Sequence, residues 1–82
     1  MKVQVLYFAV VAELVELSEE SLVLDAGVTT VGDFRKQLER HQPSLAGRLG
    51  HVRVARNARF AQDSDVIEES DELALIPPVA GG

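Results

Sequence analysis

The carboxyl end of the chain is the part of the sequence best suited to chemistry. It ends in Gly81 and Gly82, which lack a Cβ and can therefore pass through a channel too narrow for side chains. Pro77 and Pro78 precede them, and because proline fixes φ and removes an amide donor, a strand cannot easily continue into this segment. When extended, residues 77–82 span roughly 20 Å. We expect this tail to carry its terminal carboxylate into the pocket of a partner; the alternative is an idle chain end.

The other side chains that could do chemistry form no catalytic or metal-binding pattern. His41 and His51 lack the spacing of a zinc site, and a charged His41 would favour the dipole of the helix that it ends. Residues 63–72 hold six carboxylates without the glycine and ligand spacing of a calcium loop. We expect a solvated acidic loop in which Val66 and Ile67 fill the core. Because cysteine is also absent, the sequence predicts no metal, no bound cofactor and no catalytic centre of its own.

Size and charge limit the classes of partner. A chain of 82 residues forms one domain with a single modest core. Thirteen acidic against eight basic residues give a formal charge of -5, which argues against nucleic acid and anionic membranes and favours a basic partner surface. No apolar stretch approaches the roughly 18 residues of a membrane span. We therefore expect a cytoplasmic protein that binds neither nucleic acid nor membrane.

Alternating apolar residues, many of them β-branched or aromatic, predict five strands. Ser18, Glu19 and Glu20 are expected to form a polar connection before the second strand, which should pair with the first as an antiparallel hairpin. Asn57 and Ala58 are expected to form a turn. The predicted strands cover residues 2–9, 21–25, 51–56, 59–61 and 72–76.

Two helices are predicted between these strands. Residues 10–17 should form one or two helical turns. The main helix should begin at Thr30, with Asp33 as the acid of a capping box, and should end before Pro43. Apolar residues at positions i, i+3 and i+7 give this helix one face for the core. That face is formed by Val31, Phe34 and Leu38.

Strand parity predicts an exposed apolar patch beside the tail. If Gln4 and Glu72 face water, every second residue of their strands faces water too, while Tyr7 faces the core. Contiguous exposed apolar area on a small protein commonly marks a docking site. The alternative is that residues 10–17 fold over the patch. The predicted partner-binding residues, tail included, are Leu6, Phe8, Phe60, Ala74, Ile76, Pro77, Pro78, Val79 and Ala80.

Both ends of the chain resemble one family. Residues 71–82, DELALIPPVAGG, resemble the C-terminus of the small, sulfur-carrying subunit of molybdopterin synthase. Residues 5–9, VLYFA, followed by residues 13–15, ELV, resemble the first strand and helical turn of that family. Ala12 and Glu16 depart from it, since the family often has arginine and glycine there. The resemblance implies an α+β, ubiquitin-like β-grasp fold, with a mixed sheet on one main helix and the last strand parallel to the first.

The resemblance also implies a function for the tail. A bare carboxylate, with a pKa of about 3.5, is ionised at neutral pH and needs activation. In this family a ubiquitin-activating-like adenylyltransferase uses ATP to adenylate the terminal glycine, here Gly82, and a sulfur donor protein converts it to a thiocarboxylate, while Gly81 provides clearance. The tail then enters the large subunit of molybdopterin synthase, in an expected heterotetramer, and gives sulfur to a pterin precursor of the molybdenum cofactor. Catalytic side chains belong to the partners.

Other functions fit the same tail. A carrier of sulfur for thiamine or another thiolated metabolite would have the same fold and terminal chemistry. A ubiquitin-like modifier conjugated to lysines through Gly82 would use the same activated terminus, and an interaction module with an idle tail would use neither. The Pro-Pro pair before Val-x-Gly-Gly favours the molybdopterin branch. In each case we expect a β-grasp domain over residues 1–76 and an extended tail over residues 77–82.

Overall fold

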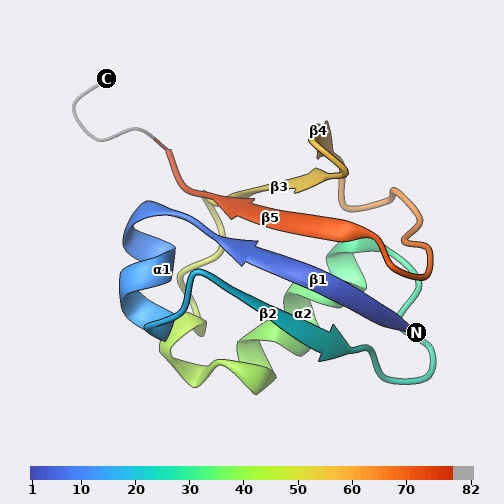
Figure 1. The fold of residues 1–82 in the computed structure, drawn as a ribbon, viewed down its shortest axis with the longest axis horizontal. Coiled ribbons are helices and arrows are strands. Elements are labelled where there is room, and N and C mark those ends of the chain that lie inside the picture. The colour runs from blue at the N-terminus through green and yellow to red at the C-terminus, as the bar shows by residue number, and fades with distance from the viewer. Residues whose placement is uncertain (79–82) are drawn as a thin grey trace.

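The structure, a computed structural model, describes residues 1–78, so the predictions for Val79, Ala80, Gly81 and Gly82 lie outside the described residues. Strands and helices follow one another through this part of the chain (Figure 1). None of the helices within residues 1–78 is long and apolar enough to cross a membrane. In chain order the elements are β1 (Lys2–Tyr7), α1 (Ala9–Val15), β2 (Glu19–Val23), α2 (Val31–His41), the 3-10 turn η1 (Pro43–Leu45), β3 (Arg53–Arg56), β4 (Arg59–Ala61) and β5 (Glu72–Ile76).

The five strands form one mixed sheet in the order β2-β1-β5-β3-β4. β1 and β5 are parallel, whereas β1 with β2, β3 with β4, and β3 with β5 are antiparallel. Figure 1 shows α2 lying across one face of this sheet and α1 at the end of the sheet where β1 and β5 finish. The predicted α+β, ubiquitin-like β-grasp fold is confirmed, including the parallel pairing of the first and last strands.

The core lies between the sheet and α2. Thr30 caps this helix by accepting a hydrogen bond from the Asp33 amide, and the Asp33 side chain accepts from the Thr30 amide, which completes the predicted capping box. Val31, Phe34 and Leu38 are completely buried, as predicted from their spacing. They pack in one cluster with Val3, Val5 and Tyr7 of β1 and with Leu73 and Leu75 of β5.

One polar side chain of α2 is also buried. Gln37 is 7% exposed, and its amide makes two hydrogen bonds with the backbone at the end of β2. Its Nε2 donates to the carbonyl of Val23 at 3.0 Å, and its Oε1 accepts from the amide of Asp25 at 2.8 Å. The amide of Leu24 donates to Met1 and therefore points toward β1. Because backbone groups of successive residues in a strand point to opposite sides, the Val23 carbonyl and the Asp25 amide point away from β1, to the outer edge of β2.

β2 begins two residues earlier than predicted, so the expectation that Glu19 and Glu20 belong to a connection is wrong. Glu20 is half-buried and accepts hydrogen bonds from the hydroxyl of Tyr7 and from Nε2 of Gln42, and its Oε1 lies 3.0 Å from Nε2 of His41. Burial raises the pKa of Glu20, but these hydrogen bonds outweigh burial and leave the pKa below its ordinary value. Burial, and then the bond to Glu20, raise the pKa of Tyr7, so its hydroxyl stays protonated.

The acidic loop after β4 is less solvated than predicted. Asp71 is 6% exposed, and its carboxylate accepts hydrogen bonds from Nε of Arg56, Nδ2 of Asn57 and the amide of Glu68. The expectation of a solvated run is therefore wrong at Asp71, because three donors replace water there. The carbonyl of Asp71 accepts from the amide of Gln4, so the residue also joins β5 to β1.

The same loop contributes one apolar residue to the core, and not the expected two. Ile67 is 3% exposed, as predicted, whereas Val66 is 60% exposed. Val66 pairs with Thr30 in an isolated β-bridge, and the amide of Ile67 donates to the carbonyl of Thr29. Because neighbouring residues of an extended segment point to opposite sides, Ile67 turns inward and Val66 turns outward.

Several non-glycine residues have left-handed backbone. Asn57 and Ala58 have φ of 51° and 71° in the predicted turn between β3 and β4, as the tightest hairpin turns require. Glu16 ends α1 with φ 59° and ψ 32°. This conformation favours glycine at the end of a helix, which explains physically why the family that the chain resembles commonly has glycine at this position.

Candidate functional site

The pairing of β1 with β5 brings the predicted patch residues together. Gln4 lies opposite Glu72 and Leu6 lies opposite Ala74 in this parallel pair. The alternate residue Tyr7 is 3% exposed and faces α2, as predicted. Leu6 and Ala74 therefore lie on the face of the sheet away from α2. This is the arrangement predicted from strand parity.

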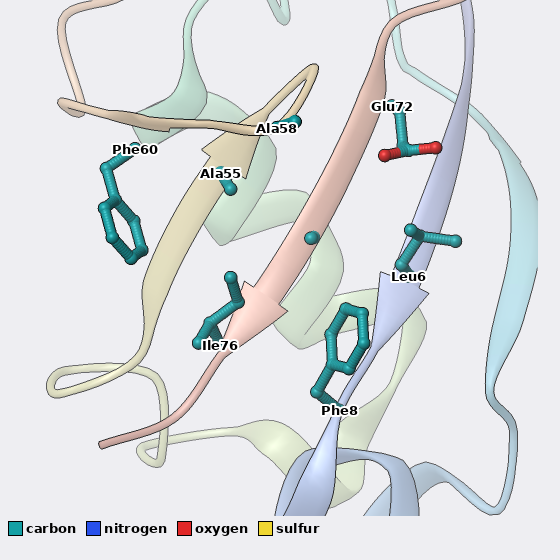
Figure 2. Close-up of a pocket in the computed structure, with 8 residues that line it drawn as sticks. Leu6, Phe8, Ala55, Ala58, Phe60, Glu72 and Ile76 are labelled. Atoms are coloured by element: carbon teal, nitrogen blue, oxygen red, sulfur yellow. The ribbon is translucent and has the colours of Figure 1, made fainter. Parts of the chain in front are cut away.

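β3 and β4 extend the same face. Ala55 of β3 lies opposite Ala74 on one side and opposite Phe60 of β4 on the other. These residues form an apolar row across three strands, with Leu6 beyond it on β1. Together they line a hollow with a volume of about 250 Å³ (Figure 2). The hollow is lined by Leu6, Phe8, Ala55, Ala58, Phe60, Glu72, Ala74 and Ile76.

The hollow has an alanine floor and aromatic walls. Ala55 and Ala74 are each only 6% exposed, whereas Phe8 is 47% and Phe60 57% exposed. Figure 2 shows Phe8 beyond the end of β1 and Phe60 on β4, on opposite sides of β5. Small side chains below and large apolar side chains around them make a socket for an apolar group of another molecule. Exposed area of this kind on a small protein is typical of a docking site.

α1 does not cover the hollow. None of the residues that line it belongs to α1, and Figure 1 places α1 at the end of the sheet. Val11 of α1 is 2% exposed because it packs into the core cluster. The alternative that residues 10–17 fold over the patch is therefore wrong, and Phe8, the residue before α1, stays accessible.

The hollow lies where the tail leaves the sheet. Ile76 is the last residue of β5 and lies opposite Arg53 of β3 at the end of the paired region. Pro77 follows and is half-buried, and Pro78 is exposed. The two prolines end the strand, as their missing amide donors predict. A molecule that fills the hollow therefore contacts Ile76, the residue directly before the tail.

The electrostatics of the hollow are uneven. Glu72 lines it toward the start of β5, and Arg53 lies near the tail, with its guanidinium 3.9 Å from the centre of the Phe60 ring. This is the geometry of a cation–π contact. Within residues 1–78 no group of three histidine, cysteine or acidic residues is placed to hold a metal ion. The chemistry of the described part of the site is therefore recognition by apolar contact and charge.

Four of these residues were not predicted as site residues: Arg53, Ala55, Ala58 and Glu72. Alternation in the third strand places Arg53 and Ala55 on one face, opposite to the valines that face the core. It does not show which strand lies beside that face. The register of β3 with β5, which depends on the whole fold, brings Ala55 beside Ala74 and so completes the floor of the hollow.

Comparison with known proteins identifies the family of this chain. Residues 5–82 match the ThiS family. The chain belongs to the ThiS family. The resemblance of both chain ends to the small subunit of molybdopterin synthase is also confirmed, because relatives named as the sulfur carrier subunit of that synthase match the whole of this chain.

Three similar proteins illustrate the range within this family. A molybdopterin synthase sulfur carrier subunit from Mycobacterium tuberculosis is 38% identical over 82 residues, which cover 100% of this chain and 99% of that protein. Small archaeal modifier protein 3 from Haloferax volcanii is 32% identical over 93 residues and covers 100% of both chains. The crystal structure of SAMP1 from Haloferax volcanii has a TM-score of 0.87, with 32% identity and 100% coverage of both chains.

Proposed function

We propose that this ThiS-family chain is a sulfur carrier that serves molybdopterin synthesis. The hollow beside the tail carries the proposal, because it lies where a docked partner would receive residues 77–82. The name of the Mycobacterium tuberculosis relative, a sulfur carrier subunit of molybdopterin synthase, supports the choice of pathway. The expected partner is accordingly the large subunit of that synthase, and the expected compartment is the cytoplasm.

The proposed chemistry begins with activation of Gly82. An oxygen of its carboxylate attacks the α-phosphate of ATP on a ubiquitin-activating-like adenylyltransferase, and pyrophosphate leaves. Sulfur supplied by a donor protein at the oxidation level of hydrosulfide then attacks the acyl carbon, and AMP leaves. The product is a thiocarboxylate, and neither step requires an oxidant or a reductant. This chain contributes the terminus and its clearance at Gly81, while ATP and catalytic groups belong to the partners.

Delivery of the sulfur is also redox-neutral. The thiocarboxylate sulfur forms a bond to an electrophilic carbon of the pterin precursor, and an oxygen leaving group departs. Water then attacks the acyl carbon, the bond between this carbon and sulfur breaks, and the sulfur stays on the pterin. The carboxylate of Gly82 is regenerated for another cycle. The described residues of this chain hold the carrier on its partner during these steps.

Docking is tested with the large subunit of molybdopterin synthase from the same organism. Phe8→Asp places a charge on the wall of the hollow, so binding measured by calorimetry should weaken by at least about 2 kcal/mol, as for a hot spot. Val66→Asp is the matched control, because Val66 is similarly exposed but lies outside the hollow. Tyr7→Asp should instead unfold the domain by burying a carboxylate. If Phe8→Asp lowers the melting temperature and Tyr7→Asp only weakens binding, the docking face is misassigned.

Sulfur loading is tested separately by intact mass. After incubation with the activating enzyme, ATP and a sulfur donor, the wild-type chain should gain the mass difference between sulfur and oxygen. Deletion of Gly82 and the variant Gly81→Ile should both abolish this gain. Their melting temperatures should stay near that of the wild type, because the core cluster comes from residues 3–75. Loading of the deletion variant would contradict the carrier function.

A second function has support from the archaeal relative. The name of small archaeal modifier protein 3 fits a chain whose activated Gly82 is attacked by a lysine amine, with formation of an isopeptide bond and loss of AMP. Intact-mass and peptide analysis of the protein from its native host separates the two functions. Thiocarboxylate alone supports the carrier, whereas branched peptides with Gly82 on a lysine support conjugation. A carrier for another thiolated metabolite would load sulfur but would not bind the synthase large subunit.

A further inference from the structure

An arginine lies on the rim of the hollow, at the point where the tail begins. Arg53 lies opposite Ile76, the last residue of β5. It shares a face of β3 with Ala55, two residues further on, and Ala55 forms part of the floor of the hollow. Its guanidinium lies 3.9 Å from the centre of the Phe60 ring, which forms one wall. A partner that fills the hollow must therefore also meet this charge.

The guanidinium of Arg53 has N–H groups that can donate hydrogen bonds to such a partner. Within residues 1–78 the ion pairs use Arg35, Arg40, His41 and Arg56, and none includes Arg53. Stacking uses the flat face of a guanidinium and leaves its N–H groups directed outward in a fork that matches a carboxylate. Stacking on Phe60 also restricts the side chain before binding, so less rotamer entropy is lost when the partner docks.

The chain segment around Arg53 is positively charged, whereas the chain as a whole is negatively charged. Residues 46–62 hold four of the eight basic residues and no acidic residue, although the whole chain has a charge of -5. Within this basic segment, Arg53 lies on the face of the hollow. Complementary charges across an interface favour the correct partner, and like charges exclude others. The partner should therefore be acidic where it meets Arg53, although the net negative charge of this chain favours a basic surface over the rest of the partner.

We propose that Arg53 determines partner specificity by binding an aspartate or glutamate of the protein that docks on the hollow. On that partner, the carboxylate lies beside an apolar side chain that inserts between Phe8 and Phe60. This inference rests on the proposed function, because it requires the hollow to be the docking site. A protein that offers a neutral or basic side chain at this position would bind the hollow more weakly.

The test measures the affinity of three variants for the synthase large subunit at low and high salt. Arg53→Met keeps a long apolar side chain over Phe60 and removes the charge, so affinity should fall about tenfold and lose much of its salt dependence. Arg53→Glu places like charges together and should weaken binding about a hundredfold. Arg59→Glu is the matched control, because it makes the same change in net charge on β4, but Arg59 is the strand neighbour of Phe60 and so points away from the face of the hollow. It should change affinity by less than about twofold.

The outcomes separate this inference from the proposed function. If Arg53→Glu and Arg59→Glu weaken binding equally, the effect is one of overall charge and the inference is overturned. It is also overturned if Arg53→Met binds as tightly as the wild type while Phe8→Asp does not, although the docking site then stands. If Phe8→Asp itself binds normally, the hollow is not the docking site and both proposals fail. Circular dichroism of each variant shows whether it is folded. If Arg53→Glu does not fold, the affinity of Arg53→Met still tests the inference.

Discussion

The carboxylate of Asp71 should contribute more to stability than any other acidic side chain in its loop. Its side chain is 7% exposed, and the carboxylate accepts from Nε of Arg56 at 2.5 Å, from the amide of Glu68 at 2.8 Å and from Nδ2 of Asn57 at 2.9 Å. Asp71→Asn keeps the shape of the side chain but replaces one oxygen by an NH₂ group. Whichever way the amide is turned, this NH₂ group faces at least one donor, since Oδ2 accepts from Arg56 and Glu68 and Oδ1 accepts from Asn57. At least one hydrogen bond is therefore lost, and the others lose the negative charge of their acceptor.

The expected loss follows from these contacts. A hydrogen bond that involves a charged group contributes about 1.5 to 3 kcal/mol. Arg56 is 29% exposed, so its guanidinium can recover some hydration, and we expect Asp71→Asn to cost about 2 to 3 kcal/mol of unfolding free energy. A domain of this length has a total stability of roughly 4 to 12 kcal/mol. The variant should therefore lose a large part of its stability.

Urea denaturation followed by circular dichroism at pH 7 measures this loss. Glu68→Gln is the matched control, because it also removes one negative charge near Arg56. Its carboxylate lies 3.8 Å from the guanidinium and is 76% exposed, so it should cost less than about 0.5 kcal/mol. If the two substitutions cost the same, the buried hydrogen bonds of Asp71 do not stabilise the fold beyond what a surface charge would.

The loss should also depend on pH. Burial raises the pKa of Asp71, but hydrogen bonds from Glu68, Arg56 and Asn57 outweigh burial and lower the pKa below its ordinary value of 3.8. The unfolded chain thus takes up this proton at a higher pH than the folded chain does. The contribution is complete above the unfolded pKa and is lost as the pH falls through the folded pKa. The difference between wild type and Asp71→Asn should shrink below about pH 4, and a difference that grows there would refute this role for the Asp71 carboxylate.

Two further substitutions test the fold. Phe34→Ala should cost about 3 to 5 kcal/mol in a denaturant titration, because the ring is completely buried between α2 and the sheet; a cost below about 1 kcal/mol would mean that this face of α2 is not the core face. Glu16→Gly should stabilise the domain by up to about 1 kcal/mol, because residue 16 has left-handed backbone with φ 59°. Glu13→Gly, inside α1, is its control and should destabilise the domain by about 1 kcal/mol.

The elements that the sequence predicted well are those set by local rules. Thr30 and Asp33 marked the start of α2 because a capping box depends on residues three apart. β4 and β5 were predicted with the bounds that the structure has, since a turn at Asn57 and Ala58 and two prolines after Ile76 limit them. The patch followed from strand parity once β1 and β5 were taken as neighbours.

The errors share a physical cause, which is that polar side chains can be buried when distant donors satisfy them. Glu20 was predicted to lie in a connection between strands because a charged side chain usually faces solvent. In the structure its carboxylate accepts hydrogen bonds from Tyr7 and Gln42, which lie far from it in sequence. Asp71 was taken as solvated for the same reason, although Arg56 and Asn57 bind it. Local patterns contain no information about such partners.

The candidate site shows the same limit. Leu6 and Phe8 were predicted as patch residues from their own strand, whereas the contribution of Ala55 depends on the register of β3 with β5. The position of Arg53 beside Ile76 depends on that register too. The alternation of residues along each strand therefore predicted which face is apolar. The pairing of the strands in the folded sheet determined the floor, the walls and the charge of the hollow.

The buried amide of Gln37 bears on how this chain behaves at high concentration. β2 is an edge strand of the sheet, and an edge with free amides and carbonyls is a template for pairing with a strand of another molecule. Gln37 occupies the outward carbonyl of Val23 and the outward amide of Asp25, in the way that a neighbouring strand would. α2 thus protects this end of β2 against edge-to-edge association and polymerisation, at the side of the sheet most distant from β4.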